Sequence, residues 1–534
     1  MLKEKVNGIL DKYPASVYKN RKQHILVVDH ESDNPQTITA NTRTIPGIIT
    51  SRGCCYAGCK GVVIGPLKDV VTITHGPIGC GYYSWGTRRN KARVDEGGDY
   101  NYLNYCFSTD LQEKDIVFGG EKKLKQAIDE VVQLLHPPTI MICSTCPVGL
   151  IGDDINAVAA WAEKEYQIRV MAFSCEGYKG VTQSAGHHIA NNGLMKYVIG
   201  TGDEPAGQYS LNILGEYNIG GDGWEVERIL KKIGYEITAV MTGNGSVKTL
   251  QNAHKANLNL VQCHRSINYI AEMINTKYGT DWLKVNYIGV QATVDSLRSV
   301  ARYFDDPGLI ARTEEVIAEE LAEVMPTIEK YRKLCEGKTA AMYVGGSRAL
   351  SYQDLFSDLG METILAGFEF AHRDDYEGRD VIPFIKEDAD SKNIENLVIE
   401  PDDQHYRLVL PREKYEQLKN EIPLNYFGGM IKEMRNDSVV IDDINHHEID
   451  EFIRVLKPDI FCAGIKEKYQ IHKAGIFSKQ LHSYDYSGPY AGFKGAAIFA
   501  RDIAMGLATP VWSLVKPPWK TEPALEGHYV EEVV

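Results

Sequence analysis

The sequence predicts an α/β protein built from three Rossmann-like domains, with mostly parallel sheets flanked by helices. Two observations predict this class. Short runs rich in β-branched residues alternate with amphipathic segments along most of the chain, and several runs are almost wholly apolar, as in strands covered on both faces. The chain has 534 residues, whereas a single hydrophobic core stops growing at roughly 250 to 300 residues, so more than one domain is expected.

The expected elements follow one another in strand-helix-strand order. Amphipathic segments, such as EKKLKQAIDEVVQLL at 121–135 and RTEEVIAEELAEVMPTIEKYRKL at 312–334, predict helices between the strands. We place domain boundaries after residues 205 and 335, which gives domains 1–205, 206–335 and 336–534. The predicted strands are 69–74 (DVVTIT), 139–144 (TIMICS), 168–174 (IRVMAFS), 236–242 (EITAVMT), 258–263 (LNLVQC), 339–345 (TAAMYVG) and 459–464 (DIFCAG).

Two segments interrupt this alternation. The stretch near 380–428 is charged and punctuated by prolines, and it has no clear helical or strand period, so we predict a surface insertion there. The last residues, 517–534 (PPWKTEPALEGHYVEEVV), are typical of a loosely held tail.

The composition indicates a soluble cytoplasmic protein. Hydrophobic residues make up 43% of the chain and charged residues 24%, which is close to the average for globular proteins. No apolar run approaches the roughly 18 to 20 residues that cross a bilayer, and the charged opening lacks the apolar core of a signal peptide. The net charge of -14 disfavours nonspecific binding to nucleic acid or membranes, although the basic run at 88–93 could bind an anion.

The eleven cysteines point to reduced thiols. An odd number scattered through a long chain argues against a disulfide framework, so each thiol is either a buried apolar group or a metal ligand. Cysteines and glycines are densest at 52–66 and 75–80, where glycine lets the backbone approach a bulky cluster and offers amides to its sulfurs. The candidate iron-sulfur ligands here are Cys54, Cys55, Cys59, Cys80, Cys143 and Cys146.

Several candidate groups follow predicted strands directly. Ligands of open parallel sheets gather at the carboxyl ends of the strands, so this position favours function over packing. A conventional zinc site is disfavoured because Cys143 and Cys146 form the only close CxxC pair. Neither a GxxxxGK[ST] loop nor a GxGxxG turn after a strand is present, so nucleotide hydrolysis and nicotinamide binding are unsupported. The groups at strand ends are Cys146, Cys175, Cys263 and the GGSR turn at 345–348.

Nine segments, in order, carry a resemblance to a known family. They are RGCCYAGCKGVV, HGPIGCGYYSWGTRRN, STCPVGLIGDDI, SCEGYKGVTQSAGHHIANN, LGEYNIGGD, NLVQCHRSINYIAEM, FEFAHRDDYEGR, GIKEKYQIHKAG and LHSYDYSGPYAGFKGAAIFARD. The chain resembles the α subunit of molybdenum-iron dinitrogenase from about residue 40 to residue 520. The segment near 380–428 is longer than in many members of that family, which leaves its effect on partner contacts open.

The resemblance implies that Cys54, Cys80 and Cys146 are this subunit's ligands to the P-cluster, an eight-iron electron relay. Such a cluster needs more thiolates than these three, so a homologous β subunit is expected to complete it within an α2β2 heterotetramer. The neighbours that receive no role from the match, and that we expect to be buried thiols, are Cys55, Cys59 and Cys143.

The resemblance also implies an iron-molybdenum cofactor with homocitrate, buried between domains. Cys263 would bind its terminal iron and His482 its molybdenum. A buried anionic cluster needs cationic and N–H partners, and a titratable histidine beside it could deliver protons. Gln183 and Lys466 are expected near the homocitrate and Val62 at the reactive face. Together, the pocket residues that the match implies are Val62, Arg88, Gln183, His187, Arg348, Phe370 and Lys466.

The implied activity is reduction of dinitrogen to ammonia with hydrogen evolution, using electrons from a separate iron protein that hydrolyses ATP; acetylene is a further expected substrate. Three rivals share the fold. A cofactor-assembly scaffold is not expected to combine His482 with Gln183, and a dark-operative tetrapyrrole reductase lacks the cofactor ligands at Cys263 and His482. Vanadium or iron-only dinitrogenase is disfavoured by the FEFAHRDDYEGR motif and the GGSR turn.

Overall fold

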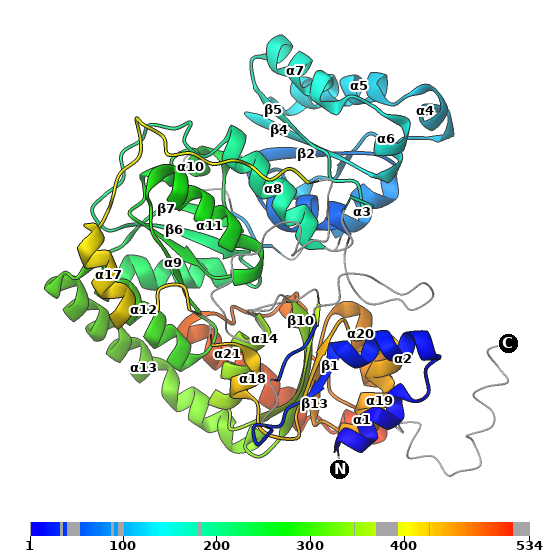
Figure 1. Cartoon of the computed structure of the whole chain (residues 1–534), viewed down its shortest axis with the longest axis vertical. Helices are drawn as coiled ribbons and strands as arrows, with labels where there is room; N and C mark the ends of the chain where they lie inside the picture. The colour runs from blue at the N-terminus through cyan, green and yellow to red at the C-terminus, as the bar shows by residue number, and fades with distance from the viewer. Residues whose placement is uncertain are drawn as a thin grey trace.

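In the computed structural model, the described residues form three sheets, each flanked by helices (Figure 1). Of the predicted site residues, Arg88 and Phe370 lie outside the described residues, as do the tail and the first part of the predicted insertion. None of the described helices is long and apolar enough to cross a membrane. The described ranges are 2–32, 36–39, 54–86, 90–93, 101–179, 183–345, 348–369, 394–426 and 428–515.

The first sheet has the strand order β3-β2-β4-β5, and all its pairs are parallel. Alternate residues of its central strands face two different cores. Ile140 and Ile142 pack with α5 and α7 on one side, while Met141 and Cys143 face a core shared with η2, α8 and α11. The elements are η2 (Ala57–Ile64), β2 (Val70–His75), α3 (Ile78–Gly86), η3 (Tyr102–Asn104), β3 (Phe107–Ser108), α4 (Glu113–Phe118), α5 (Glu121–Leu135), β4 (Thr139–Ser144), α6 (Cys146–Ile151), α7 (Ile155–Tyr166), β5 (Arg169–Phe173) and α8 (Gln183–Tyr197).

The second sheet has the order β7-β6-β8-β9 and is also fully parallel. Leu214, Met241 and Val261 of this sheet contribute to the core that contains Met141 and Cys143, so the first two sheets share one apolar contact region. The elements are β6 (Ser210–Glu216), α9 (Asp222–Ile233), β7 (Glu236–Thr242), α10 (Val247–Leu250), η4 (Ala253–Lys255), β8 (Leu258–Val261), α11 (His264–Tyr278), β9 (Trp282–Lys284), α12 (Val290–Phe304) and α13 (Pro307–Cys335).

The third sheet has the order β1-β12-β11-β10-β13, and its edge strand β1 comes from the beginning of the chain. β1 runs antiparallel to β12, and the other pairs are parallel. The elements are α1 (Leu2–Leu10), α2 (Ala15–Arg21), η1 (Lys22–His24), β1 (Ile25–Val27), β10 (Thr339–Gly345), α14 (Arg348–Asp358), β11 (Glu362–Glu369), α17 (Arg412–Glu421), α18 (Met430–Glu433), β12 (Val439–Asp442), α19 (His446–Leu456), β13 (Ile460–Cys462), α20 (Ile465–Lys473), η5 (Tyr484–Tyr486), α21 (Gly492–Ala508) and α22 (Val511–Leu514).

A buried ion pair attaches the first helices to this sheet rather than to the sheet that follows them in sequence. Arg21 Nε donates to Glu448 Oε1 at 2.7 Å, and both side chains are almost completely buried. The Glu448 side chain also accepts a hydrogen bond from the backbone N–H of Asn445 at the start of α19. The Asn445 side chain accepts one from the backbone N–H of Glu448, and the two bonds form a capping box. In Figure 1, α1 and α2 accordingly lie beside α19. Residues 2–28 of the predicted domain 1–205 therefore pack with the third sheet.

The predicted α/β class with parallel, helix-flanked sheets is confirmed, and the seven predicted strand runs overlap β2, β4, β5, β7, β8, β10 and β13. The prediction that 380–428 has no helical period is wrong at 412–421, which forms α17. That helix buries only Leu418 among its ten residues, so it lacks the apolar stripe by which an amphipathic helix is recognised.

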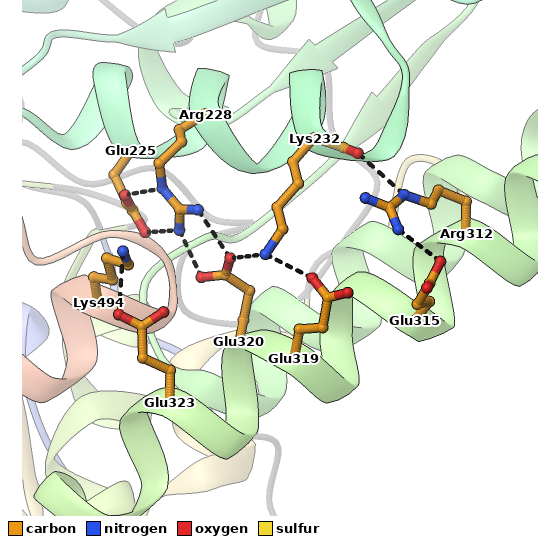
Figure 2. A network of polar contacts seen from close by, with 9 residues as sticks. All are labelled: Glu225, Arg228, Lys232, Arg312, Glu315, Glu319, Glu320, Glu323 and Lys494. Atoms are coloured by element: carbon orange, nitrogen blue, oxygen red, sulfur yellow. Dashed lines mark hydrogen bonds and ion pairs between the residues drawn. The ribbon is translucent and has the colours of Figure 1, made fainter.

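An ionic network joins helices of the second and third sheets (Figure 2). The Glu320 side chain on α13 is buried, and it receives hydrogen bonds from Arg228 at 2.8 and 2.6 Å and from Lys232 at 2.7 Å. Burial opposes ionisation of Glu320, but these cations outweigh it and lower its pKa to about 2. Lys494 of α21 reaches Glu323 one turn along, at 3.2 Å. α13 is thus held against both α9 and α21.

Candidate functional site

Cys54, Cys80 and Cys146 converge at the edge of the first sheet. A Cβ atom built on Gly177 would lie 3.1 Å from Cys146 Sγ and 3.5 Å from Cys54 Sγ, so both sulfurs approach the same glycine. Partial burial raises the pKa of Cys80, and the neighbouring thiolates of Cys54 and Cys146 raise it further. Cys80 lies on α3, and Cys146 is the first residue of α6 after β4. Three thiols separated by 92 residues of sequence therefore form one donor set.

This donor set is open to solvent and bordered by apolar side chains. Cys54 and Cys80 are exposed and Cys146 is half-buried. A contiguous group of large exposed apolar residues on one chain marks a binding surface, because water contact with it is unfavourable. The geometry therefore favours a cluster that a second polypeptide covers. The exposed apolar residues on the nearby elements α3, α6 and the 176–179 turn are Ile78, Tyr82, Tyr83, Leu150 and Tyr178.

Cys263 occupies the N-cap of α11, directly after β8, and is half-buried. The neighbouring strand β6 comes unusually close to it at Gly215. A Cβ on Gly215 would lie 2.7 Å from Cys263 N and 2.8 Å from Cys263 Cβ, and the backbone there has a φ of +80°. Only glycine accommodates both the close approach and this conformation. Gly215 therefore fixes the position of Cys263, a role that sequence reasoning did not assign.

His482 is half-buried and packs against a second glycine. A Cβ on Gly464 would lie 2.9 Å from His482 Nδ1. Gly464 immediately precedes α20, whose second residue is Lys466, and the Lys466 side chain is exposed in the isolated chain. The amide of Leu481 donates to Ala463 O at 3.1 Å, which holds the two segments together. The structure thus brings the predicted Lys466 and His482 onto adjacent segments.

Arg348 begins α14 after β10 and is largely buried. Its Nη1 donates to the Tyr484 hydroxyl at 3.1 Å, and Tyr352 donates to the same oxygen at 2.9 Å. The Nη2 atom is buried and has no hydrogen-bond partner among the residues that the structure describes. One edge of the guanidinium is therefore anchored, and the other retains donors suited to an anionic group.

Asp222 connects Arg348 with the segment that follows His482. Its Oδ2 accepts from the Tyr484 hydroxyl at 2.5 Å, and its Oδ1 accepts from the amides of Tyr490 at 2.7 Å and Ala491 at 3.0 Å. Burial beside Asp222 raises the pKa of Glu216 to about 7. Both acids lie in the LGEYNIGGD motif, but sequence reasoning gave neither a role.

Residues at the carboxyl end of β6, or just after it, contact both Cys263 and the segment that follows His482. Gly215, near the end of that strand, contacts Cys263. Asp222, the first residue of the following helix α9, binds Tyr484, two residues after His482. This is the edge where ligands of parallel sheets are bound.

Val62, Gln183 and His187 lie where η2 meets α8. A Cβ on Gly58 would lie 1.9 Å from Gln183 O, so the two helices touch backbone to backbone. Val62 is half-buried and packs against the cores of both the first and the second sheets, and its carbonyl accepts from Thr242 Oγ1 at 3.2 Å. His187 is buried one turn after Gln183 on α8.

The donor types fit metal-sulfur groups. Thiolates bind iron-sulfur clusters, and a thiolate with an imidazole suits transition metals of intermediate softness. The buried Nη2 of Arg348, which lacks a partner in the described part of the chain, fits an anionic group in the same region. None of the eleven cysteines forms a disulfide.

Mostly parallel α/β sheets with cysteine sulfur donors at strand ends define a class of metal-sulfur protein. The chain belongs to the nitrogenase component 1 type oxidoreductase family, whose sequence model matches residues 54–508. It is 58% identical over 513 residues to the nitrogenase molybdenum-iron protein alpha chain of Clostridium pasteurianum, covering 96% of each chain. It is 54% identical to that of Methanosarcina barkeri, covering 97% of each.

A solved structure supports the same assignment. "Nitrogenase Cp1 at pH 6.5" superposes with a TM-score of 0.93 at 57% identity, covering 97% of this chain and 100% of that one. The resemblance to the α subunit of molybdenum-iron dinitrogenase is therefore confirmed, and the chain is an oxidoreductase of this family.

Proposed function

We propose that this chain is the catalytic α subunit of a molybdenum-iron dinitrogenase that reduces dinitrogen to ammonia and protons to hydrogen. The observation that carries the proposal is a pair of glycine contacts, Gly215 against Cys263 and Gly464 against His482. Each contact holds a metal-binding side chain that the family resemblance assigns to the cofactor. Both surroundings connect to the carboxyl end of β6 through Gly215 and Asp222.

In this proposal Cys263 binds the terminal iron of an iron-molybdenum cofactor and His482 its molybdenum, with homocitrate beside Gln183 and Lys466. When bound, the cofactor supplies the multi-electron chemistry. The chain supplies ligation, counter-charge and the exclusion of water. Arg348 contributes a buried cation whose Nη2 has no hydrogen-bond partner in the described part of the chain, and Arg88 and Lys466 are further cations proposed at the site.

His187 is the proposed proton donor. It is buried, so the protein rather than bulk water controls its protonation. Its position one turn from Gln183 directs both side chains from the same face of α8. Val62 and Phe370 are proposed to shape the pocket at the reactive face, where size limits which substrates besides dinitrogen and acetylene can enter.

Cys54, Cys80 and Cys146 are proposed to bind a P-cluster shared with a homologous β subunit. The exposure of Cys54 and Cys80 and the apolar residues beside them support a partner at this edge. Electrons would reach the cluster one at a time from an ATP-hydrolysing iron protein. We place the α2β2 assembly in the cytoplasm, because free thiols persist in a reducing compartment.

Metal analysis of the anaerobically purified complex tests this function. We expect molybdenum stoichiometric with the chain, alongside many irons, and loss of molybdenum in Cys263→Ala with the P-cluster spectra retained. Cys462→Ala is the control, because it removes a buried thiol from β13 of the third sheet. Vanadium or iron alone in place of molybdenum would reassign the enzyme type. A chain that transfers its cofactor to another protein and shows no reductase activity would be the assembly scaffold.

A further inference from the structure

Three cysteines that the proposed function does not use meet in the core of the first sheet. Cys59 lies in η2, Cys143 in β4, and Cys175 follows the end of β5. All three side chains are fully buried, and their sulfur atoms lie within 4.8 Å of one another. We refer to Cys59, Cys143 and Cys175 as the thiol triad. Three different elements thus direct one thiol each toward a common point.

The thiols of the triad interact with one another. Burial by itself raises the pKa of a thiol, but hydrogen bonds from Cys175 and Cys59, with the charge of Lys60, lower the pKa of Cys143 well below its ordinary value. Burial raises the pKa values of Cys59 and Cys175, and the contact that each makes with Cys143 raises them further. The Cys175 thiol also lies within hydrogen-bond distance of the backbone, with its Sγ donating to Ser144 O at 3.5 Å. A thiolate is the form of cysteine that binds metals.

The spacing of the sulfurs fits a single metal ion. With metal-sulfur bonds of about 2.3 Å, the ligands of one ion lie about 4 Å apart, which the 4.8 Å limit of the triad admits. An iron-sulfur cluster places its irons at separate corners and requires more widely spaced thiolates. The triad is therefore a mononuclear site rather than a second cluster site.

The number of donors selects the type of ion. Across the described ranges, no histidine, aspartate or glutamate joins the three thiols, and complete burial keeps solvent from serving as a fourth ligand. Structural zinc is almost always held by four ligands in a tetrahedron. Soft thiolates select Cu(I) among the metals that accept a purely sulfur environment. We propose that the thiol triad binds one Cu(I) ion in a three-sulfur site.

Charge balance is compatible with this ion. A monovalent cation on the Cys143 thiolate gives a neutral pair, which costs less to bury than a divalent ion with one thiolate. Each further thiol that binds as a thiolate releases a proton and adds a negative charge. Lys60, buried and next to Cys59 in sequence, supplies a compensating cation, with its Nζ donating to Ser84 Oγ at 2.9 Å.

The triad shares its elements with the proposed P-cluster ligands but uses different residues. Cys143 precedes Cys146 by three positions, and Cys59 follows Cys54 by five. A bound ion would join η2, β4 and the segment after β5 in the protein interior. Cys54 and Cys146 would keep their own sulfurs for the cluster.

The test uses the intact complex, in which the proposed clusters occupy the other metal-binding thiols. Protein is purified anaerobically from cells grown with and without added copper, and a second portion is incubated with Cu(I) supplied as its bicinchoninate complex. We expect copper stoichiometric with the chain by mass spectrometry. Copper X-ray absorption is expected to show three sulfur neighbours at about 2.3 Å.

Variants distinguish the triad from adventitious binding. Cys59→Ser and Cys175→Ser are expected to lower bound copper at least about tenfold, while Cys462→Ser, which alters another fully buried thiol, retains it. Iron content and thermal unfolding show whether each variant has folded. The copper X-ray absorption spectrum of the parent protein tests the three-sulfur site without any variant.

The proposal is overturned if neither route loads copper, if Cys175→Ser binds as much as the parent protein, or if the spectrum shows oxygen or nitrogen ligands. Preferential loading of zinc would overturn the three-coordinate assignment. The readout is copper rather than dinitrogen reduction. A result against the copper site therefore does not contradict the proposed catalytic function. A result against the catalytic function likewise does not contradict the copper site.

Discussion

The hydroxyl of Tyr484 donates a 2.5 Å hydrogen bond to Oδ2 of Asp222, joining two buried residues that are 262 positions apart in the chain. The other oxygen of the same carboxylate accepts the amides of Tyr490 and Ala491. A single side chain at the start of α9 thus organises the loop after His482 and the partners of Arg348. This carboxylate is a positioning group for the proposed cofactor site.

Asp222→Asn should weaken the hydrogen bonds that this side chain accepts, while the size and shape of the side chain stay nearly the same. The amide keeps one acceptor but places an NH2 group toward either Tyr484 or the two backbone amides, and it removes the counter-charge near Arg348. We expect the free energy of unfolding to fall by about 3 kcal/mol, as is typical when one member of a buried charged network is neutralised. Chemical denaturation measures this change.

Cofactor content gives a second measure of the same substitution, and molybdenum per chain should fall together with the stability. Asp450→Asn, at an exposed position of α19, is the control and should change the unfolding free energy by less than about 0.5 kcal/mol. Equal stability of Asp222→Asn and the parent protein would show that the carboxylate charge is not required.

Gly215→Ala should displace Cys263 from its ligand position. The added Cβ would lie 2.7 Å from Cys263 N, which is closer than real Cβ contacts, and this nitrogen is a backbone atom that cannot rotate away as a flexible side chain could. We expect molybdenum to be lost while P-cluster spectra remain, as for Cys263→Ala. Gly337→Ala is a matched control, because Gly337 has a similar φ of +77° but nothing within 4 Å of its Cβ position.

The Gly337→Ala control separates the cost of backbone strain from the cost of the clash with Cys263. Both substitutions carry the strain of a left-handed residue, about 1 kcal/mol, but only Gly215→Ala produces a clash. Molybdenum content that falls equally in the two variants would mean that backbone strain, and not contact with Cys263, is responsible.

The sequence was sufficient to predict the fold class and the strands with continuous apolar character, because burial on both faces requires that composition. It also located Cys146, Cys263 and Arg348 directly after strands, where the structure has them. β6 was not predicted because only three of its seven residues are apolar: Leu211, Ile213 and Leu214. In the core, Asn212 Nδ2 donates to Asn259 Oδ1 of β8 at 2.8 Å. A buried polar pair across neighbouring strands leaves no signal in either strand alone.

The supporting parts of the site could not be predicted for a similar reason. The contacts of Gly215 with Cys263 and of Gly464 with His482 join residues distant in sequence, and a glycine in a sequence does not reveal what approaches it. The pairing of β1 with β12 depends on Arg21 meeting Glu448, more than 400 residues away. Sequence patterns report local burial, whereas these features depend on which elements meet.

Val62→Ala should widen the range of alkynes that the enzyme reduces. Val62 is half-buried at the junction of the first two sheets, and the proposal places it against the reactive face. Removing two methyl groups should raise the ratio of propyne to acetylene reduction by about tenfold. Val63→Ala is the control, since Val63 is fully buried in the core. An unchanged ratio with full cofactor content would remove Val62 from the pocket.

The ion pairs of Glu320 predict a stability that depends on pH. Its folded-state pKa of about 2 lies below the ordinary value of 4.5, so its contribution is fully present above pH 4.5 and is lost as the pH falls toward 2. Arg228 and Lys232 are partly exposed, so solvent screening reduces the contribution of these ion pairs to the free energy of unfolding. Glu320→Gln should therefore lower the free energy of unfolding by about 2 kcal/mol at pH 7.

Urea denaturation of Glu320→Gln and the parent protein at several pH values checks this, and the difference between them should shrink below pH 4.5. Glu315→Gln provides the control in the same network (Figure 2), because Glu315 is 60% exposed and binds only the exposed Arg312 among its drawn neighbours. Its effect should stay below about 0.5 kcal/mol at every pH. A Glu320→Gln difference that is as large near pH 2.5 as at pH 7 would mean that packing of the side chain, rather than its charge, holds α13 against α9.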